Sequence, residues 1–235
     1  MKNVFKKFEN GFTLAEVLIT LVVIGVVASL TIPTAINKFK ERTTIEKIKS
    51  SYAILSTAYR LAQMENGYKF SEWNCDNFEN FSNASKTSNC MTYYIKKHLS
   101  RVKDCEIGKG YHPIKTCFDV DDGNSYSIDG VDMGAFDSGA GDMFILSNGV
   151  PVAIRRKNFM YIKTDNSNKL IFNKNFFFFF IYDDDRGLMP YNNDENAWGC
   201  WSSTNKDNIR KGLISGCSQS AIEWIFTKGN MDYLR

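Results

Sequence analysis

The longest apolar pattern in the sequence is the run from Val17 to Ile32, which is preceded by Phe12-Thr-Leu-Ala-Glu16. With Phe12 and its neighbours included, the run has about 20 residues, and at ~1.5 Å per residue it matches a hydrocarbon core of ~30 Å. One carboxylate, Glu16, interrupts the run near its start. An ionisable group at that depth costs about 2.5–3.5 kcal/mol on insertion scales. The pattern therefore predicts a membrane-spanning helix whose Glu16 needs a partner.

Beyond Pro33 the pattern becomes amphipathic. Apolar residues recur in steps of three and four, which draws one stripe along a helix: Ile45, Ile48, Tyr52, Leu55, Tyr59 and Ala62. Asn66-Gly67 is a helix stop, because glycine tolerates the left-handed conformation that ends many helices. We therefore expect one helix from Phe12 to Asn66. Its stripe needs a cover, either the following domain or a coiled-coil partner, and the short repeat favours the domain.

The second half of the chain reads as β structure. Residues 143–147 and 150–154 flank Asn148-Gly149, a pair that suits a type I′ hairpin turn. Further strands are expected at 159–163 and 170–182, where five consecutive phenylalanines occupy 176–180. Alternate residues of a strand point to opposite faces. One face of this strand can pack on the long helix, and the other must be covered by loops, a neighbouring subunit or a partner.

Two shorter segments carry local patterns of their own. Residues 91–99 read as a short amphipathic helix, and residues 221–226, Ala-Ile-Glu-Trp-Ile-Phe, read as a strand. The rest of residues 68–125 reads as loops that disulfides hold together.

Six cysteines all follow residue 70, and no Cys-x-x-Cys pair occurs among them. An even count confined to the distal part of the chain fits an oxidising compartment and three disulfides. Proximity favours Cys75 with Cys90 and Cys105 with Cys117, although six cysteines allow fifteen connectivities. Cys200 and Cys217 then bound a polar loop near the C-terminus.

Charge and motifs narrow the functional classes. The net charge is +3, of which residues 1–11 supply +2, so the remaining chain is too near neutral to suggest nucleic acid as its main partner. The sequence shows no Gly-rich phosphate loop, no nucleophile elbow and no HExxH motif. No catalytic set is therefore visible, and we do not expect an enzyme.

The first eleven residues, Met-Lys-Asn-Val-Phe-Lys-Lys-Phe-Glu-Asn-Gly, form a basic leader before the apolar run. A secretory signal peptide is one interpretation, but the run exceeds the usual 7–15 residues and contains a carboxylate. An uncleaved signal anchor is another, and it leaves Gly11 and Glu16 unexplained. Taken together, Gly11-Phe12, Glu16 and the apolar run resemble the N-terminus of a type IV prepilin or type II secretion pseudopilin.

This resemblance implies how the chain is processed and assembled. A prepilin peptidase would cut between Gly11 and Phe12 and methylate the new amine of Phe12. Glu16 would pair with the terminal amine of a neighbouring subunit and set its register. Pro33 matches a proline that pilins commonly carry at this distance from the cut, and it should kink or locally melt the helix. Some pseudopilins bind calcium in a distal loop, which makes Asp183 and Asp185 candidate ligands.

The expected fold is α+β: a long N-terminal helix packed on an antiparallel sheet, with disulfide-stapled loops. The expected segments are a leader (1–11), a membrane and assembly helix (12–33), its amphipathic continuation (34–66) and an extracytoplasmic globular domain (67–235). We expect a minor pilin or pseudopilin that first spans the inner membrane once, with its leader in the cytoplasm, and then joins a filament. Its partners would be other subunits, the prepilin peptidase, the inner-membrane assembly platform and the lipid bilayer. The alternative is a membrane-anchored surface binding protein that never polymerises.

Overall fold

The computed structural model describes residues 12–76, 83–105, 117–136, 140–155, 159–190 and 219–234. The chain divides into two compact units, residues 1–41 and 42–235. Helix α1 (Leu14–Asn66) begins in the first unit and ends in the second. It is the long helix that the sequence predicts, and it ends at the predicted stop, where Gly67 takes a φ of +106°.

Within the second unit, α1 buries the predicted stripe. Its deepest residues are less than a tenth exposed, and they belong to one core cluster: Ile45, Ile48, Leu55, Tyr59 and Ala62. Tyr52 packs against the same cluster while partly exposed. The globular domain therefore covers the stripe, as the sequence favours, and the spacing of three and four residues places the stripe on one side of the helix.

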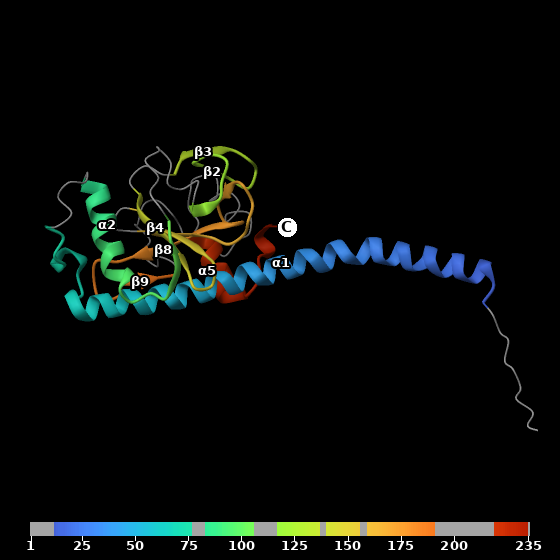
Figure 1. The fold of residues 1–235 in the computed structure, drawn as a ribbon, viewed down its shortest axis with the longest axis horizontal. Coiled ribbons are helices and arrows are strands. Elements are labelled where there is room, and N and C mark those ends of the chain that lie inside the picture. Colours follow the sequence, from blue (N-terminus) through green and yellow to red (C-terminus); the bar gives the residue numbers. More distant parts are fainter. Residues whose placement is uncertain are drawn as a thin grey trace, which may run out of the picture. The chain divides into compact units, whose positions relative to one another are not determined.

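A six-stranded antiparallel sheet forms the centre of this unit (Figure 1). Its strands, in spatial order, are β1 (Arg101–Asp104), β4 (Ala140–Leu146), β5 (Pro151–Arg155), β6 (Phe159–Lys163), β8 (Phe176–Ile181) and β9 (Leu188–Met189). Each neighbouring pair runs antiparallel. The sheet carries the predicted hairpin and the strand predicted at 159–163. The segment predicted at 170–182 is divided, because 176–181 form β8 of this sheet and 170–171 form a strand of a second sheet.

A second, three-stranded sheet contributes Leu170 to a second buried cluster. It is built from β3 (Asp132–Ala135), β2 (Asn124–Tyr126) and β7 (Leu170–Ile171), with β2 and β7 parallel. Figure 1 shows β2 and β3 at the top of the globular unit. The sequence reading places loops in this region up to residue 125, so β1 and β2 are corrections to it. Strands of two to four residues carry too little alternation to be recognised in one sequence.

The phenylalanine run is buried on both of its faces. Phe177 and Phe179 join the cluster that contains the α1 stripe, whereas Phe176, Phe178 and Phe180 join a second cluster beneath the small sheet. All five side chains are at most 6% exposed. β8 is therefore a fully covered strand between two cores, which is the arrangement that its unbroken apolar sequence requires.

The β4–β5 hairpin forms where it is predicted, but its turn differs. Gly149 is left-handed, with φ of +78°, while Asn148 is not, so the type I′ prediction is wrong. The Gly149 N–H donates to Leu146 O at 2.9 Å, and the Leu146 N–H donates to Val150 O at 2.9 Å. This is the pattern of a three-residue loop that ends in a glycine bulge. The Asn148 amide is used elsewhere: its Nδ2 donates to Ser50 and Ser51 of α1.

The prediction of a strand at 221–226 is wrong, because these residues belong to helix α5 (Gln219–Lys228). Ala221, Ile222 and Ile225 are fully buried, and their spacing of one and four is helical. The β-branched and aromatic residues favour a strand locally, but packing against the core favours the helix. The other helices in the described residues are α2 (Asn83–Lys96), η1 (Phe70–Glu72) and η3 (Asp232–Leu234). α2 begins eight residues before the predicted start at Met91.

These elements give an α+β protein in which the C-terminal part of α1 packs on an antiparallel sheet, as the sequence predicts. α2 and α5 contribute to the same core cluster as α1, and the small sheet covers the opposite face of β8.

Candidate assembly and processing site

The first unit exposes nearly all of its described apolar surface. From Phe12 to Lys40 every residue except the half-buried Ala28 is exposed. The large apolar side chains in the run are 42–87% exposed, with Phe12 at the upper limit. Among the described residues, α1 is the one helix long and apolar enough to cross a membrane. An exposed apolar surface of this extent is expected to be covered by lipid or by another protein.

Polar side chains within the run are satisfied inside the helix. The hydroxyls of Thr20, Ser29 and Thr31 donate to the carbonyls of Val17, Val26 and Val27, at 2.8–2.9 Å. A bilayer core offers no water to such groups, so each must find its partner within the protein. The run can therefore lie in hydrocarbon without an unpaired hydroxyl.

Glu16 is held at the first turn of α1 by Thr13. The Thr13 N–H and the Thr13 hydroxyl both donate to Glu16 Oε2 at 2.8 Å, and the Glu16 N–H donates to Thr13 Oγ1 at 3.2 Å. This reciprocal pattern is a capping box, in which Thr13 is the N-cap and Glu16 is the third helical residue. The sequence reading missed it, although Thr-x-x-Glu before an apolar run is its signature. The box satisfies two N–H groups that would otherwise be unpaired at the helix start.

The remaining carboxylate oxygen of Glu16 has no hydrogen-bond donor among the described residues, since each of these bonds to the carboxylate ends on Oε2. The carboxylate is thus fixed in orientation and still has one oxygen available. Phe12 is adjacent to Thr13, whereas Gly11 lies outside the described residues. The structure therefore does not describe the Gly11–Phe12 peptide bond, where cleavage is expected.

Pro33 lies inside α1, which continues through it without a break. The expected local melting is therefore not seen. Proline has no N–H, so the Ser29 carbonyl lacks its usual donor four residues later. The helix tolerates this loss because the flanking turns remain bonded.

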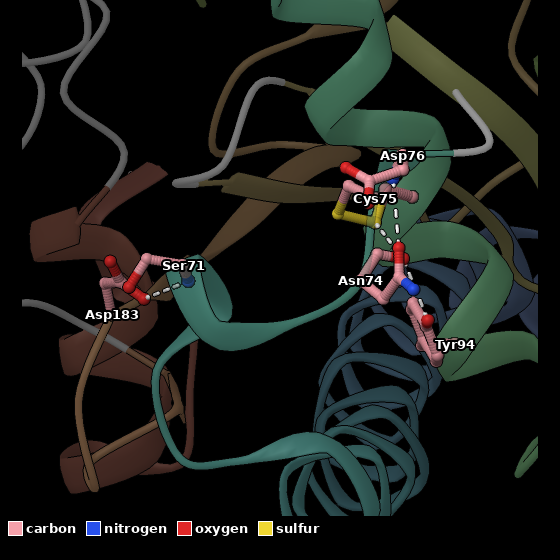
Figure 2. The surroundings of a disulfide bond; sticks show 7 residues. Ser71, Asn74, Cys75, Asp76, Tyr94 and Asp183 are labelled. Atoms are coloured by element: carbon pink, nitrogen blue, oxygen red, sulfur yellow. Dashed lines mark hydrogen bonds between the residues drawn. A yellow bond between two sulfur atoms is a disulfide. The ribbon is translucent and has the colours of Figure 1, made fainter. Parts of the chain in front are cut away.

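The described residues contain two disulfides, and they are the pairings that proximity in the sequence favours. Cys75 and Cys90 connect the loop after α1 to α2, and Cys105 and Cys117 close a second loop. Figure 2 shows the first disulfide beside Asn74, whose carbonyl accepts the Tyr94 hydroxyl at 2.9 Å. Cys200 and Cys217 lie outside the described residues.

In the acidic turn after β8, two of the three aspartate side chains bind other groups of the protein. Asp183 Oδ1 accepts the N–H of Ser71 at 3.2 Å (Figure 2), while Asp185 is exposed. Between them, Asp184 forms a salt bridge with Arg186 at 2.6 Å. Hydrogen bonds from the Arg186 side chain hold the pKa of Asp184 below its usual value. Within the described residues, no group of three or more His, Cys, Asp or Glu side chains could hold a metal ion. Asp183 and Asp185 therefore belong to no such group in the described part of the chain, and Asp184 between them is paired with Arg186.

Comparison with known families adds one finding. The family model of the prokaryotic N-terminal methylation motif matches residues 6–32. Residues 6–32 therefore carry the N-terminal motif of a type IV pilin-like precursor. The match covers residues 6–11 of the leader and the apolar run, so it places Gly11, Phe12 and Glu16 inside a recognised motif. Comparisons with curated proteins and with solved structures gave no significant match.

The motif match does not extend to the globular unit, so the only comparison available for that unit is its fold. A long N-terminal helix packed with an antiparallel sheet and loops stapled by disulfides is consistent with a pilin fold. The apolar helix and the motif together fit a membrane-anchored protein with a single span.

Proposed function

We propose that the chain is a minor pilin or pseudopilin: a structural subunit of a type IV pilus or of a type II secretion-type filament. The observation that supports this most is Glu16, a carboxylate held by a capping box at the start of an exposed apolar helix. A plain membrane anchor needs no carboxylate there, and an unpaired one costs about 2.5–3.5 kcal/mol.

Processing would create the partner that this carboxylate lacks. Prepilin peptidase would cleave after Gly11, and Phe12 would become the methylated first residue. The new amine would carry a positive charge next to Thr13, within about one helical turn of Glu16. Glu16 Oε1 could then bind the amine of its own chain or of a neighbour, because opposite charges attract strongly in a low dielectric. In a filament, the bond to a neighbour would fix the axial register.

The proposed life cycle follows from this chemistry. The precursor spans the inner membrane once through residues 12–33, with its leader in the cytoplasm and its globular domain outside. After cleavage, the assembly platform moves it into a filament of like subunits, in the periplasm or at the cell surface. The role is structural, and catalysis is assigned to none of its residues.

The first test is the intact mass and N-terminal sequence of the protein recovered from cell envelopes without reducing agent. We expect a chain that begins at methylated Phe12. A chain that begins at Met1 would indicate an uncleaved anchor, and one that begins near Ser29 would indicate a secreted protein. Either result would contradict the proposal.

Two substitutions then separate the charge of Glu16 from its capping role. Glu16→Gln keeps an acceptor oxygen and remains compatible with a capping box, whereas Glu16→Ala removes both the charge and the cap. We expect both variants to be cleaved and both to be lost from filaments, measured by shearing and immunoblotting. Glu46→Ala, which removes an exposed carboxylate later in α1, is the matched control and should assemble normally. Normal assembly of Glu16→Gln would show that the charge is not needed.

A further inference from the structure

The segment that follows the apolar run combines exposed apolar and basic side chains. Ile36 is 47% exposed and Phe39 is 71% exposed. Lys38 and Lys40 are exposed as well, and neither side chain has an ion pair or hydrogen bond with any other residue that the structure describes. Residues three and four apart are neighbours on a helix, so Phe39 and Lys40 both lie beside Ile36.

Helix length places this segment at the membrane surface. Phe12 to Ile32 spans about 30 Å at ~1.5 Å per residue, which fills the hydrocarbon core. Lys38 and Lys40 lie about 9–12 Å further along the helix, while the headgroup layer on each side is about 5–8 Å thick. Long lysine side chains can extend back toward the phosphates, with their apolar stems along the helix.

Processing leaves these lysines as the first basic residues of the chain. No lysine or arginine occurs between Phe12 and Lys38, and the three lysines of the leader are removed by the proposed cleavage. The positive charge next to the membrane in the mature chain would therefore lie on the side of the globular domain. That side would attract anionic lipid.

We propose that Ile36–Lys40 is a lipid-binding collar, in which Lys38 and Lys40 bind the phosphates of anionic phospholipids while the subunit waits in the membrane. This inference depends on the proposed function in one respect only, namely that the chain is anchored in a membrane by its N-terminal helix. Each basic residue near an anionic surface gives a preference of about fivefold over a zwitterionic one. The collar would retain unassembled subunits in anionic regions of the bilayer, and assembly would have to release it.

The test is lysine acetylation of the processed full-length protein in nanodiscs of phosphatidylcholine alone or with phosphatidylglycerol. At low salt we expect Lys38 and Lys40 to react about fivefold more slowly, or slower still, when phosphatidylglycerol is present. The protection should vanish in ~1 M salt, where the screening length is only ~3 Å. Lys174, an exposed lysine of the globular unit, is the internal control and should react equally in both nanodiscs.

A pair of variants completes the design. Lys38→Gln/Lys40→Gln should lose most of the phosphatidylglycerol that co-purifies with the protein from mixed nanodiscs. Lys174→Gln/Lys228→Gln removes the same charge and should lose none. Equal reactivity of Lys38 and Lys40 in both lipids, or equal protection in both, would overturn the proposal. If that happens while Glu16-dependent assembly persists, only the collar is wrong. Recovery from cells of a chain that begins near Ser29, and so lacks the apolar run, would instead refute the proposed function.

Discussion

Tyr59 brings a phenol hydroxyl into the core of the second unit. Its side chain is fully buried, and its hydroxyl has no hydrogen-bond partner among the described residues. Burial, and secondarily the nearby charges of Asp183 and Asp184, raise the pKa of Tyr59 well above its usual value. The folded state therefore holds this proton more tightly than the unfolded chain does.

We expect Tyr59→Phe to be neutral or stabilising at pH 7, raising the free energy of unfolding by up to about 1 kcal/mol, because the phenylalanine buries no unpaired hydroxyl. The pH dependence has a definite sign. Above about pH 10 the unfolded chain loses the Tyr59 proton while the folded chain keeps it, so stability falls as pH rises. Urea unfolding between pH 8 and 11 should show a shallower alkaline loss in the variant.

Tyr233→Phe is the matched control, because its buried hydroxyl donates to Asn173 O at 2.7 Å. This substitution leaves a buried carbonyl without that donor and should cost about 1 kcal/mol or more at pH 7. If both variants were destabilised equally, Tyr59 would have a hydrogen-bond partner that this interpretation lacks.

Gly187 is required at its position by both conformation and space. Its φ is +62°, and an added Cβ would lie 2.7 Å from Gln63 Oε1 and 3.1 Å from the ring of Tyr59. Gly187→Ala should therefore lower the free energy of unfolding by about 2–3 kcal/mol, which combines left-handed strain of about 1–2 kcal/mol with the clash. Gly130→Ala has a similar φ of +83° and open space around it, so only the strain of about 1–2 kcal/mol should appear. Equal losses would show that the contact with α1 adds nothing.

At the scale of elements, β8 connects two cores. Phe179 packs near Tyr52 of α1, with ring centroids 5.4 Å apart, while Phe178 packs against Phe159 at 5.3 Å on the opposite face. We expect Phe178→Ala and Phe179→Ala each to cost about 3–5 kcal/mol in urea unfolding. The exposed Val131, at 52%, gives a control whose change to Ala should stay within about 0.5 kcal/mol. A loss in only one of the two phenylalanine variants would mean that one face of β8 is loosely covered.

Long elements with strong periodicity could be predicted from the sequence. The α1 stripe and the two-faced phenylalanine strand each repeat a pattern often enough to identify both the element and its buried side. Short elements could not, because β2 and β7 have only three and two residues. α5 was misread since Ile, Trp and Phe favour strands locally, although its buried residues at 221, 222 and 225 follow a helical period.

The candidate site, too, could be predicted from the sequence only in part. Glu16 is recognisable as an isolated carboxylate in an apolar run, and its capping box with Thr13 could have been predicted from Thr-x-x-Glu. That both Thr13 donors converge on one carboxylate oxygen depends on side-chain rotamers, and the sequence does not determine them. The fate of Asp183 also depends on a distant contact, with Ser71, that no local pattern indicates.

At the scale of the whole molecule, the two units differ in what they need in order to fold. The described residues of both core clusters begin at Ile45, within the second unit. We expect residues 42–235, expressed in an oxidising compartment, to fold without residues 1–41 and to melt within a few degrees of the full chain. Circular dichroism melts would measure this, with the reduced protein as a destabilised reference. A fragment with near-native helix content but no cooperative melt would contradict the expectation.

The hydroxyls inside the apolar run have one more consequence, which concerns reversibility. Thr20, Ser29 and Thr31 carry their hydrogen bonds with them, so this helix presents nearly the same hydrocarbon exterior in any apolar surrounding. Lipid tails are about as apolar as leucine side chains, so moving the helix from lipid into a bundle of like helices removes little surface from water. A subunit could then return to the bilayer about as readily as it left. The direction of travel would be set by the machinery that pushes or pulls, and by the single charge pair at Glu16.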